Sequence, residues 1–225
     1  MYQTRVTGIC TSANSKTWEL KYTEHPSVQS KFKRCLDITG SLVGLLVLAI
    51  LFVPIAIAIK IDSRGSIFFT QERYGLQGQP FRIRKFRSMV SDAEQLKSLV
   101  SNEANGLIFK NKNDFRITKI GRFLRSTSLD ELPQFWNVLV GEMSLVGTRP
   151  PTGDEVMKYT HHHWKRLNVK PGLTGEWQVS GRSQVKDFEQ IVDLDLRYQE
   201  NWYPLYDLLL IAKTFYVLFG RIGAF

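Results

Sequence analysis

Two adjacent carboxylates, Asp130 and Glu131, are the side chains of this sequence best suited to chemistry on phosphorus. They lie in the string SLDELPQ, residues 128–134, between basic flanking residues. A carboxylate can attack phosphorus and form an acyl phosphate, which makes Asp130 a candidate nucleophile. A diphosphate substrate would bring negative charge toward this anion, so the site would also need a divalent metal ion or arginine side chains.

The same string also has a purely structural interpretation. Ser128 and Glu131 have the spacing of a capping box, and Asp130 would then lie in the first helical turn, where the helix dipole favours negative charge. Spacing alone favours this interpretation over catalysis. The string therefore allows either a nucleophile or a helix cap, and other parts of the chain must decide between them.

Several basic side chains could bind the phosphates of a substrate. Three arginines lie beside turn-forming Gly, Pro or Ser residues and could present a forked guanidinium to phosphate oxygens: Arg125, Arg149 and Arg182. A second basic group lies close together in a β-prone piece and comprises Arg82, Arg84, Lys85 and Arg87. The run from His161 to His163 is not a metal set, because adjacent positions on a helix point in different directions.

An uncharged segment from Ile38 to Ile59 has the length that a helix needs to cross a bilayer, about twenty residues. A buried helix of a soluble protein rarely stays apolar on every face for so long. Basic residues flank both ends, namely Lys31, Lys33 and Arg34 before the segment and Lys60 and Arg64 after it. Because Pro54 removes a helical hydrogen bond, a kinked hairpin that leaves by the face it entered is one topology. A straight span is the other.

The overall composition limits the partners and the compartment. The 225 residues include 30 Lys and Arg against 21 Asp and Glu, so the chain carries a net charge of +9 that favours lipid headgroups, nucleotides or nucleic acid. Cys10 and Cys35 form no metal or disulfide pattern, which indicates a reducing compartment. The first thirty residues are polar and lack a secretory signal.

The remaining segments predict an α+β domain. A β-hairpin is expected between Ile67 and Met89, and Gly and Pro residues supply its turn. A basic amphipathic helix at 116–125 lies either on a phosphate-rich surface or in water. The aromatic stretch at 201–219 makes either a second, shallow membrane contact or a core contact. A helix at 152–167 and a glycine-punctuated loop at 170–182 complete the prediction.

Five ordered motifs give the chain a resemblance to a known family. They are KRCLD at 33–37, KFRSM at 85–89, RSTSLDELPQ at 125–134, GTRP at 147–150 and KPGLTG at 170–175. From about residue 31 to the C-terminus, the chain resembles the bacterial sugar transferases, also called monotopic phosphoglycosyl transferases. With this resemblance, catalysis becomes a stronger interpretation of the carboxylate pair than helix capping.

The resemblance implies a fold and a location. Residues 1–30 would form a flexible polar leader, residues 31–61 a re-entrant helix-break-helix with its break at Pro54, and residues 62–225 the catalytic domain. That domain would be mostly helical, with a small β-hairpin and interfacial amphipathic helices. It would lie at the cytoplasmic face of the bacterial inner membrane, and a homodimer is allowed.

The resemblance also implies a reaction. Asp130 would attack the β-phosphate of a UDP-sugar and release UMP, and undecaprenyl phosphate would then accept the hexose phosphate to begin an exopolysaccharide. Glu131 would assist proton handling or positioning, and Mg²⁺ would bridge Asp130 to the diphosphate. The basic positions that contact phosphate or nucleotide would be Lys85, Arg125, Arg149 and Arg182. Glucose or galactose is the expected sugar, and nucleic acid is not an expected partner.

Two positions depart from the family pattern. Val53 precedes Pro54 where the family often has Ser, so a hydroxyl that could satisfy the broken backbone is missing. Glu176 stands where an apolar residue is more usual. Two other functions stay open from the sequence: a membrane-anchored phosphatase or hydrolase with the same carboxylates, and a non-catalytic membrane scaffold.

Overall fold

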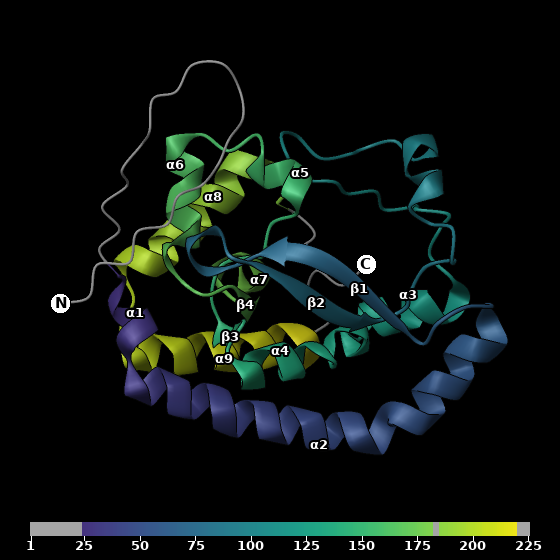
Figure 1. Ribbon diagram of the computed structural model, residues 1–225, viewed down its shortest axis with the longest axis horizontal. Helices are drawn as coiled ribbons and strands as arrows, with labels where there is room; N and C mark the ends of the chain where they lie inside the picture. Colours follow the sequence, from purple (N-terminus) through teal and green to yellow (C-terminus); the bar gives the residue numbers. More distant parts are fainter. Residues whose placement is uncertain (1–23, 182–184, 220–225) are drawn as a thin grey trace.

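The computed structural model describes residues 24–181 and 185–219. A long helix, α2 (Lys31–Asp62), follows the short α1 (Pro26–Gln29) and runs along one side of the molecule (Figure 1). The other helices are α3 (Lys119–Ser126), α4 (Gln134–Val140), α5 (Gly153–Val156), α6 (His161–Trp164), α7 (Glu176–Val179), α8 (Phe188–Glu200) and α9 (Pro204–Phe219). Single 3-10 turns are η1 (Leu76–Gly78), η2 (Gln95–Leu99), η3 (Leu129–Glu131) and η4 (Lys165–Asn168).

The strands form two small sheets. β1 (Phe68–Tyr74) and β2 (Pro80–Phe86) pair antiparallel with Phe68 opposite Phe86, as the sequence predicts. β3 (Ser144–Val146) and β4 (Gly172–Thr174) pair in parallel, although the second of these lies in a segment predicted to be loop. Gly147 and Gly172 allow this pairing, because a Cβ on Gly172 would lie 2.1 Å from the nitrogen of Gly147. The mixture of helices and small sheets confirms the α+β class.

Helix α2 begins where Ser30 accepts a hydrogen bond from the Lys33 backbone N–H at 3.2 Å. Its 32 residues correspond to about 48 Å, which is longer than a hydrocarbon layer of about 30 Å. Within the described part of the chain, it is the helix whose length and apolar composition suffice to cross a membrane. Its outward face is apolar, with Leu46 63 % exposed and Ile50 68 % exposed.

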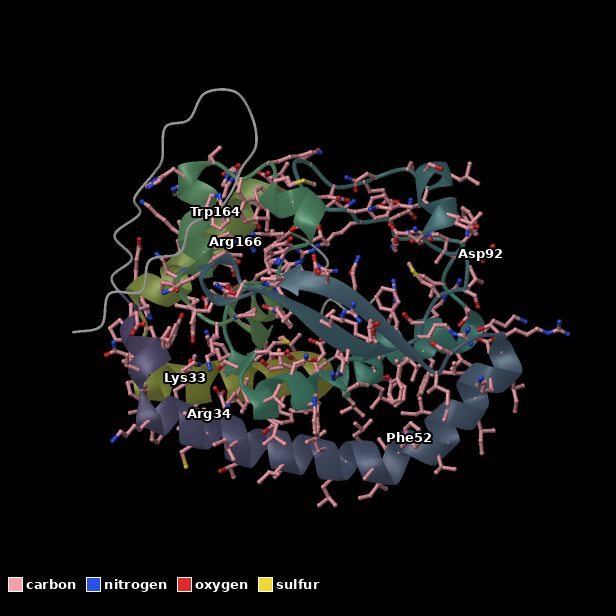
Figure 2. The ribbon with its side chains drawn as sticks, in the orientation of Figure 1. Lys33, Arg34, Phe52, Asp92, Trp164 and Arg166 are labelled. Carbon is pink, nitrogen blue, oxygen red and sulfur yellow. The ribbon has the colours of Figure 1, made fainter. Side chains whose placement is uncertain are left out.

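The interruption predicted at Pro54 takes the form of a bend within a continuous helix. Pro54 lies inside α2, which keeps its helical conformation to Asp62. The helix changes direction near Phe52, which Figure 2 labels. The Phe52 ring stacks at 5.8 Å on Phe68 of β1, so the hairpin packs against the helix at the bend. The helix is therefore bent toward the domain without being divided in two.

Both ends of α2 are bound to the same domain. At the N-terminal end, Asp37 accepts hydrogen bonds of 2.8 Å from the Ser144 hydroxyl and the Leu145 backbone N–H of β3. At the C-terminal end, Asp62 accepts a 2.8 Å bond from the backbone N–H of Ile120 in α3. Between these two contacts, the helix presents an apolar face away from the domain, and this face continues at Ile57 and Ile61, which are 55 % and 82 % exposed.

A buried ion pair, which we call the entry clamp, fixes the start of α2. Lys33 Nζ lies 2.8 Å from Asp207 Oδ2 in α9 and donates to the Val146 carbonyl at 2.8 Å. Asp207 also accepts from the Tyr198 hydroxyl at 2.8 Å and from the Trp202 indole at 3.2 Å. A buried charge is tolerated when it is paired and hydrogen-bonded in this way.

Two predictions, of one helix and of one loop, were wrong. The helix expected at 152–167 is divided into α5, α6 and η4, because Thr152 and Thr160 each cap a separate helix start. The loop expected at 170–182 contains β4 and α7. The spacing of hydrophobic residues depends on neighbours along the chain. It therefore reveals neither a second helix cap nor a three-residue strand whose partner lies far away in the sequence.

Candidate active site

One cleft, with a volume of about 1510 Å³, runs between α2, the β1–β2 hairpin and α9. Its lining includes five of the six residues predicted to act in catalysis or substrate binding: Lys85, Arg125, Asp130, Glu131 and Arg149. These residues come from β2, α3, η3 and the segment after β3, so folding gathers side chains that are far apart in the sequence. Arg182 lies outside the described residues. The roles of all six remain predictions.

A strained turn presents the carboxylate pair. Ser128, directly before η3, has a φ of 55° in the left-handed region, which non-glycine residues rarely adopt. The turn carries Asp130, whose exposed fraction is 6 %, to the wall of the cleft. The Ser128 side chain makes no capping bond to η3, so the capping-box interpretation of this string is wrong.

Glu131 is paired with Lys85. Lys85 Nζ lies 2.8 Å from Glu131 Oε1, and the two side chains are 26 % and 16 % exposed. The lysine comes from β2, which brings its positive charge to the carboxylate pair. An ion pair at a cleft wall holds Glu131 in place while leaving both groups within reach of a bound ligand.

Arg125 is held at its place by the KFRSM segment. Its Nε donates a 2.9 Å hydrogen bond to the Ser88 hydroxyl. Arg125 lies in the last turn of α3, and Ser88 follows β2. Two of the motifs noted in the sequence therefore meet at this contact beside the carboxylate pair.

Arg149 is oriented by a partner that the sequence analysis did not identify. Its Nη1 and Nη2 donate to the two carboxylate oxygens of Glu155 at 2.7 and 3.1 Å. Burial opposes ionisation of Glu155, but the charges of Arg149 and Arg73 outweigh it and hold its pKa below the ordinary value. The Arg149 guanidinium also lies 5.9 Å from the Trp177 ring. Arg149 is thus charged and fixed at one side of the cleft.

A second buried ion pair supports the segment that carries Arg149. Arg166, labelled in Figure 2, is fully buried and donates to Asp195 Oδ2 through Nε at 2.8 Å and Nη2 at 2.6 Å. Its carbonyl accepts a 3.1 Å bond from the Thr148 hydroxyl. The sequence analysis missed Ser88, Glu155 and Arg166, because each acts on a residue that only the fold brings near it.

The donor set beside the cleft suits a magnesium ion. The described residues contain no group of three or more His, Cys, Asp or Glu side chains that could hold a metal ion by themselves. Mg²⁺ in phosphate-handling sites usually takes one or two carboxylates and completes its shell with water and substrate oxygens. Asp130 and Glu131 fit that requirement. His163 hydrogen-bonds to the Thr160 backbone and to Glu189 at 3.0 Å.

The profile of a family described as bacterial sugar transferase matches residues 28–221. The chain belongs to the bacterial sugar transferase family. A galactosyl transferase of Streptococcus agalactiae, CpsE, is 48 % identical over 92 % of this chain and 46 % of its own length. An undecaprenyl-phosphate galactose phosphotransferase of Salmonella typhimurium is 42 % identical over 86 % of this chain and 41 % of its own.

A shorter relative matches this bacterial sugar transferase over most of both chains. The exopolysaccharide production protein ExoY of Rhizobium meliloti is 38 % identical over 81 % of this chain and 83 % of its own length. By contrast, this chain spans about half the length of the first two relatives. The family match over residues 28–221 covers the α2 segment and the cleft residues.

Proposed function

We propose that this protein transfers a hexose-1-phosphate from a UDP-sugar to undecaprenyl phosphate through a covalent phospho-aspartyl intermediate. The observation that carries the proposal is the cleft in which Asp130 and Glu131 lie with Lys85, Arg125 and Arg149. A carboxylate nucleophile among cations is what an attack on a diphosphate requires. Relatives named as an undecaprenyl-phosphate galactose phosphotransferase and a UDP-glucose:undecaprenyl-phosphate glucose-1-phosphate transferase favour galactose or glucose as the sugar.

In the first step, a carboxylate oxygen of Asp130 attacks the β-phosphorus of the UDP-sugar. The bond from this phosphorus to the bridging oxygen breaks, UMP leaves with that oxygen, and the sugar phosphate stays esterified to Asp130. The cationic side chains Arg125 and Arg149 stabilise the charge that develops on the leaving phosphate. In the second step, a phosphate oxygen of the lipid attacks the same phosphorus and releases the Asp130 carboxylate.

Asp130 and Glu131 would hold a bound Mg²⁺, which would neutralise charge on the diphosphate. Lys85 keeps Glu131 beside the nucleophile through their 2.8 Å contact. Glu131 thereby orients the reacting carboxylate, and it is the group that would handle a proton of the incoming acceptor. Arg149 binds a phosphate or the nucleotide, and its hydrogen bonds to Glu155 hold the guanidinium in the orientation for this contact.

We also propose that α2 is re-entrant and lies at the cytoplasmic face of the inner membrane; its contacts support the re-entrant position. Asp37 and Asp62, near opposite ends of the helix, both hydrogen-bond to one domain, and a single domain cannot lie on both sides of a bilayer. Single cysteines at Lys31 and Arg64, in a chain without its native cysteines, test this. An impermeant reagent added to intact cells is expected to label neither site, whereas labelling of one site alone would exclude the re-entrant position.

The decisive experiment traps the intermediate. Incubation with Mg²⁺ and UDP-galactose or UDP-glucose, without lipid, should release UMP and leave a hexose phosphate on Asp130 that mass spectrometry detects. Asp130→Asn should abolish both products, because an amide does not attack phosphorus at a useful rate. Release of free sugar phosphate without acceptor would instead identify a hydrolase. A folded wild-type protein without any turnover would identify a scaffold.

A further inference from the structure

The cleft continues from the carboxylate pair into an apolar groove between two helices. We call this part the acceptor groove and define it by its lining residues: Leu36, Gly40, Val43, Gly44 and Val47 of α2, and Ile211, Thr214, Phe215, Val217 and Leu218 of α9. None of these side chains carries a charge. The spacing places each set on one side of its helix, so the two helices face each other across the groove.

The walls of the acceptor groove are held in place by specific contacts. A Cβ on Gly44 would lie 2.4 Å from the Phe135 ring, so α2 packs directly against α4 at this point. The Thr214 and Thr174 hydroxyls of α9 and β4 lie 2.7 Å apart. The Tyr206 hydroxyl donates a 2.8 Å bond to Glu176 of α7. Glu176, one of the two positions that depart from the family pattern, therefore helps to fix α9 at the edge of the cleft.

We infer that the isoprenoid chain of the acceptor lies in the groove between α2 and α9, with its phosphate at the carboxylate pair. This inference rests on the proposed function, in which an amphiphilic lipid phosphate and a polar nucleotide sugar use the same site. The cleft has lining of both kinds, because the cations Lys85, Arg125 and Arg149 line it together with the uncharged side chains of α2 and α9. A nucleotide sugar has no long apolar part that could cover the groove.

Two pairs of positions allow a matched test. Leu218 lines the groove and is 40 % exposed, whereas Leu209 on the same helix is 41 % exposed and lies outside it. On α2, Val43 lines the groove and Val53 does not, and both are 59 % exposed. Tryptophan at Leu218 or Val43 fills the groove, whereas tryptophan at Leu209 or Val53 adds the same bulk outside it.

The experiment compares Leu218→Trp and Val43→Trp with Leu209→Trp and Val53→Trp in detergent micelles of constant composition. We expect the two groove variants to raise the KM for undecaprenyl phosphate about tenfold over the control variants, as displacement of a few apolar contacts should do. The penalty should shrink with geranyl phosphate, whose short chain occupies less of the groove. Each variant is also tested for the burst of UMP that appears without acceptor.

Each outcome is informative. Equal KM values for the acceptor in all four variants would overturn the inference. A loss of the UMP burst as large as the loss of transfer would also overturn it, because the groove would then bind the UDP-sugar. A wild-type chain that releases no UMP from UDP-sugars would instead contradict the proposed function. The inference alone fails if UMP release and lipid product are normal and the groove variants match their controls.

Discussion

Two lysine–carboxylate pairs in this protein share one distance but lie in different surroundings. Lys33–Asp207 and Lys85–Glu131 are both 2.8 Å apart. The first pair is 6 % and 1 % exposed, and Tyr198, Trp202 and the Val146 carbonyl complete its hydrogen bonds. The second pair is partly exposed at the cleft. An ion pair that is enclosed by its hydrogen-bond partners, such as Lys33–Asp207, can act only on the stability of the fold. An ion pair that stays accessible at a cleft, such as Lys85–Glu131, can also contact a ligand.

The largest expected effect is on stability, at the entry clamp. Lys33→Met leaves the buried Asp207 without its cation, which should lower the free energy of unfolding by about 3–5 kcal/mol. Thermal or denaturant unfolding in detergent measures this loss. Lys31→Met, two residues earlier at an exposed position, serves as the control and should change the free energy of unfolding little. Equal stability of the two variants would show that the clamp does not hold α2.

The cleft pair should behave in the opposite way. Lys85→Met should lower kcat/KM by about a hundredfold, because Glu131 loses its orienting partner beside the nucleophile. The free energy of unfolding should change by less than about 1 kcal/mol, because a partly exposed pair contributes little. Steady-state UMP release and unfolding of the same preparations separate the two effects. Arg82→Met, on the exposed side of the same strand, should leave both quantities unchanged.

The Arg149–Glu155 pair is intermediate, since Glu155 is only 6 % exposed whereas Arg149, at the cleft, is 19 % exposed. Glu155→Gln should raise the KM for the UDP-sugar about tenfold, because the Arg149 guanidinium loses its bidentate partner. Asp154→Asn is the matched control, because the neighbouring Asp154 side chain is 73 % exposed. An unchanged KM in Glu155→Gln would show that Arg149 needs no positioning.

The same pair predicts an acid dependence of stability. The pKa of Glu155 is lowered in the folded protein, because the nearby arginines outweigh the cost of burial. A carboxylate with a lowered pKa stabilises the fold fully above its ordinary pKa of about 4, and this stabilisation is lost as the pH falls through the folded value. Unfolding measured below about pH 5 should therefore show a smaller acid-induced loss in Glu155→Gln than in the wild type.

The smallest expected effect comes from removing the entry clamp as a pair. Lys33→Met combined with Asp207→Leu should recover most of the stability lost in Lys33→Met, to within about 1 kcal/mol of the wild type, because neither charge is then left buried alone. A double-mutant cycle on the free energy of unfolding measures the coupling. Additive losses would mean that the two side chains stabilise the fold independently.

The sequence by itself determined the features that local patterns encode. The apolar run of α2, the hairpin between its Gly and Pro residues and the motif that carries Asp130 are each contiguous, so neighbouring residues suffice to predict them. Family resemblance, which depends on the order of such motifs, was confirmed by the match over residues 28–221.

Tertiary structure alone decided which residues act on one another. Lys33 and Asp207 are 174 positions apart, and Lys85 and Glu131 are 46 positions apart, so no local pattern could pair them. The same holds for the β3–β4 pairing and for the turn in which Ser128 adopts a left-handed conformation instead of capping a helix. Such contacts depend on long-range packing and burial, because the energy of a charge pair is set by the groups that enclose it.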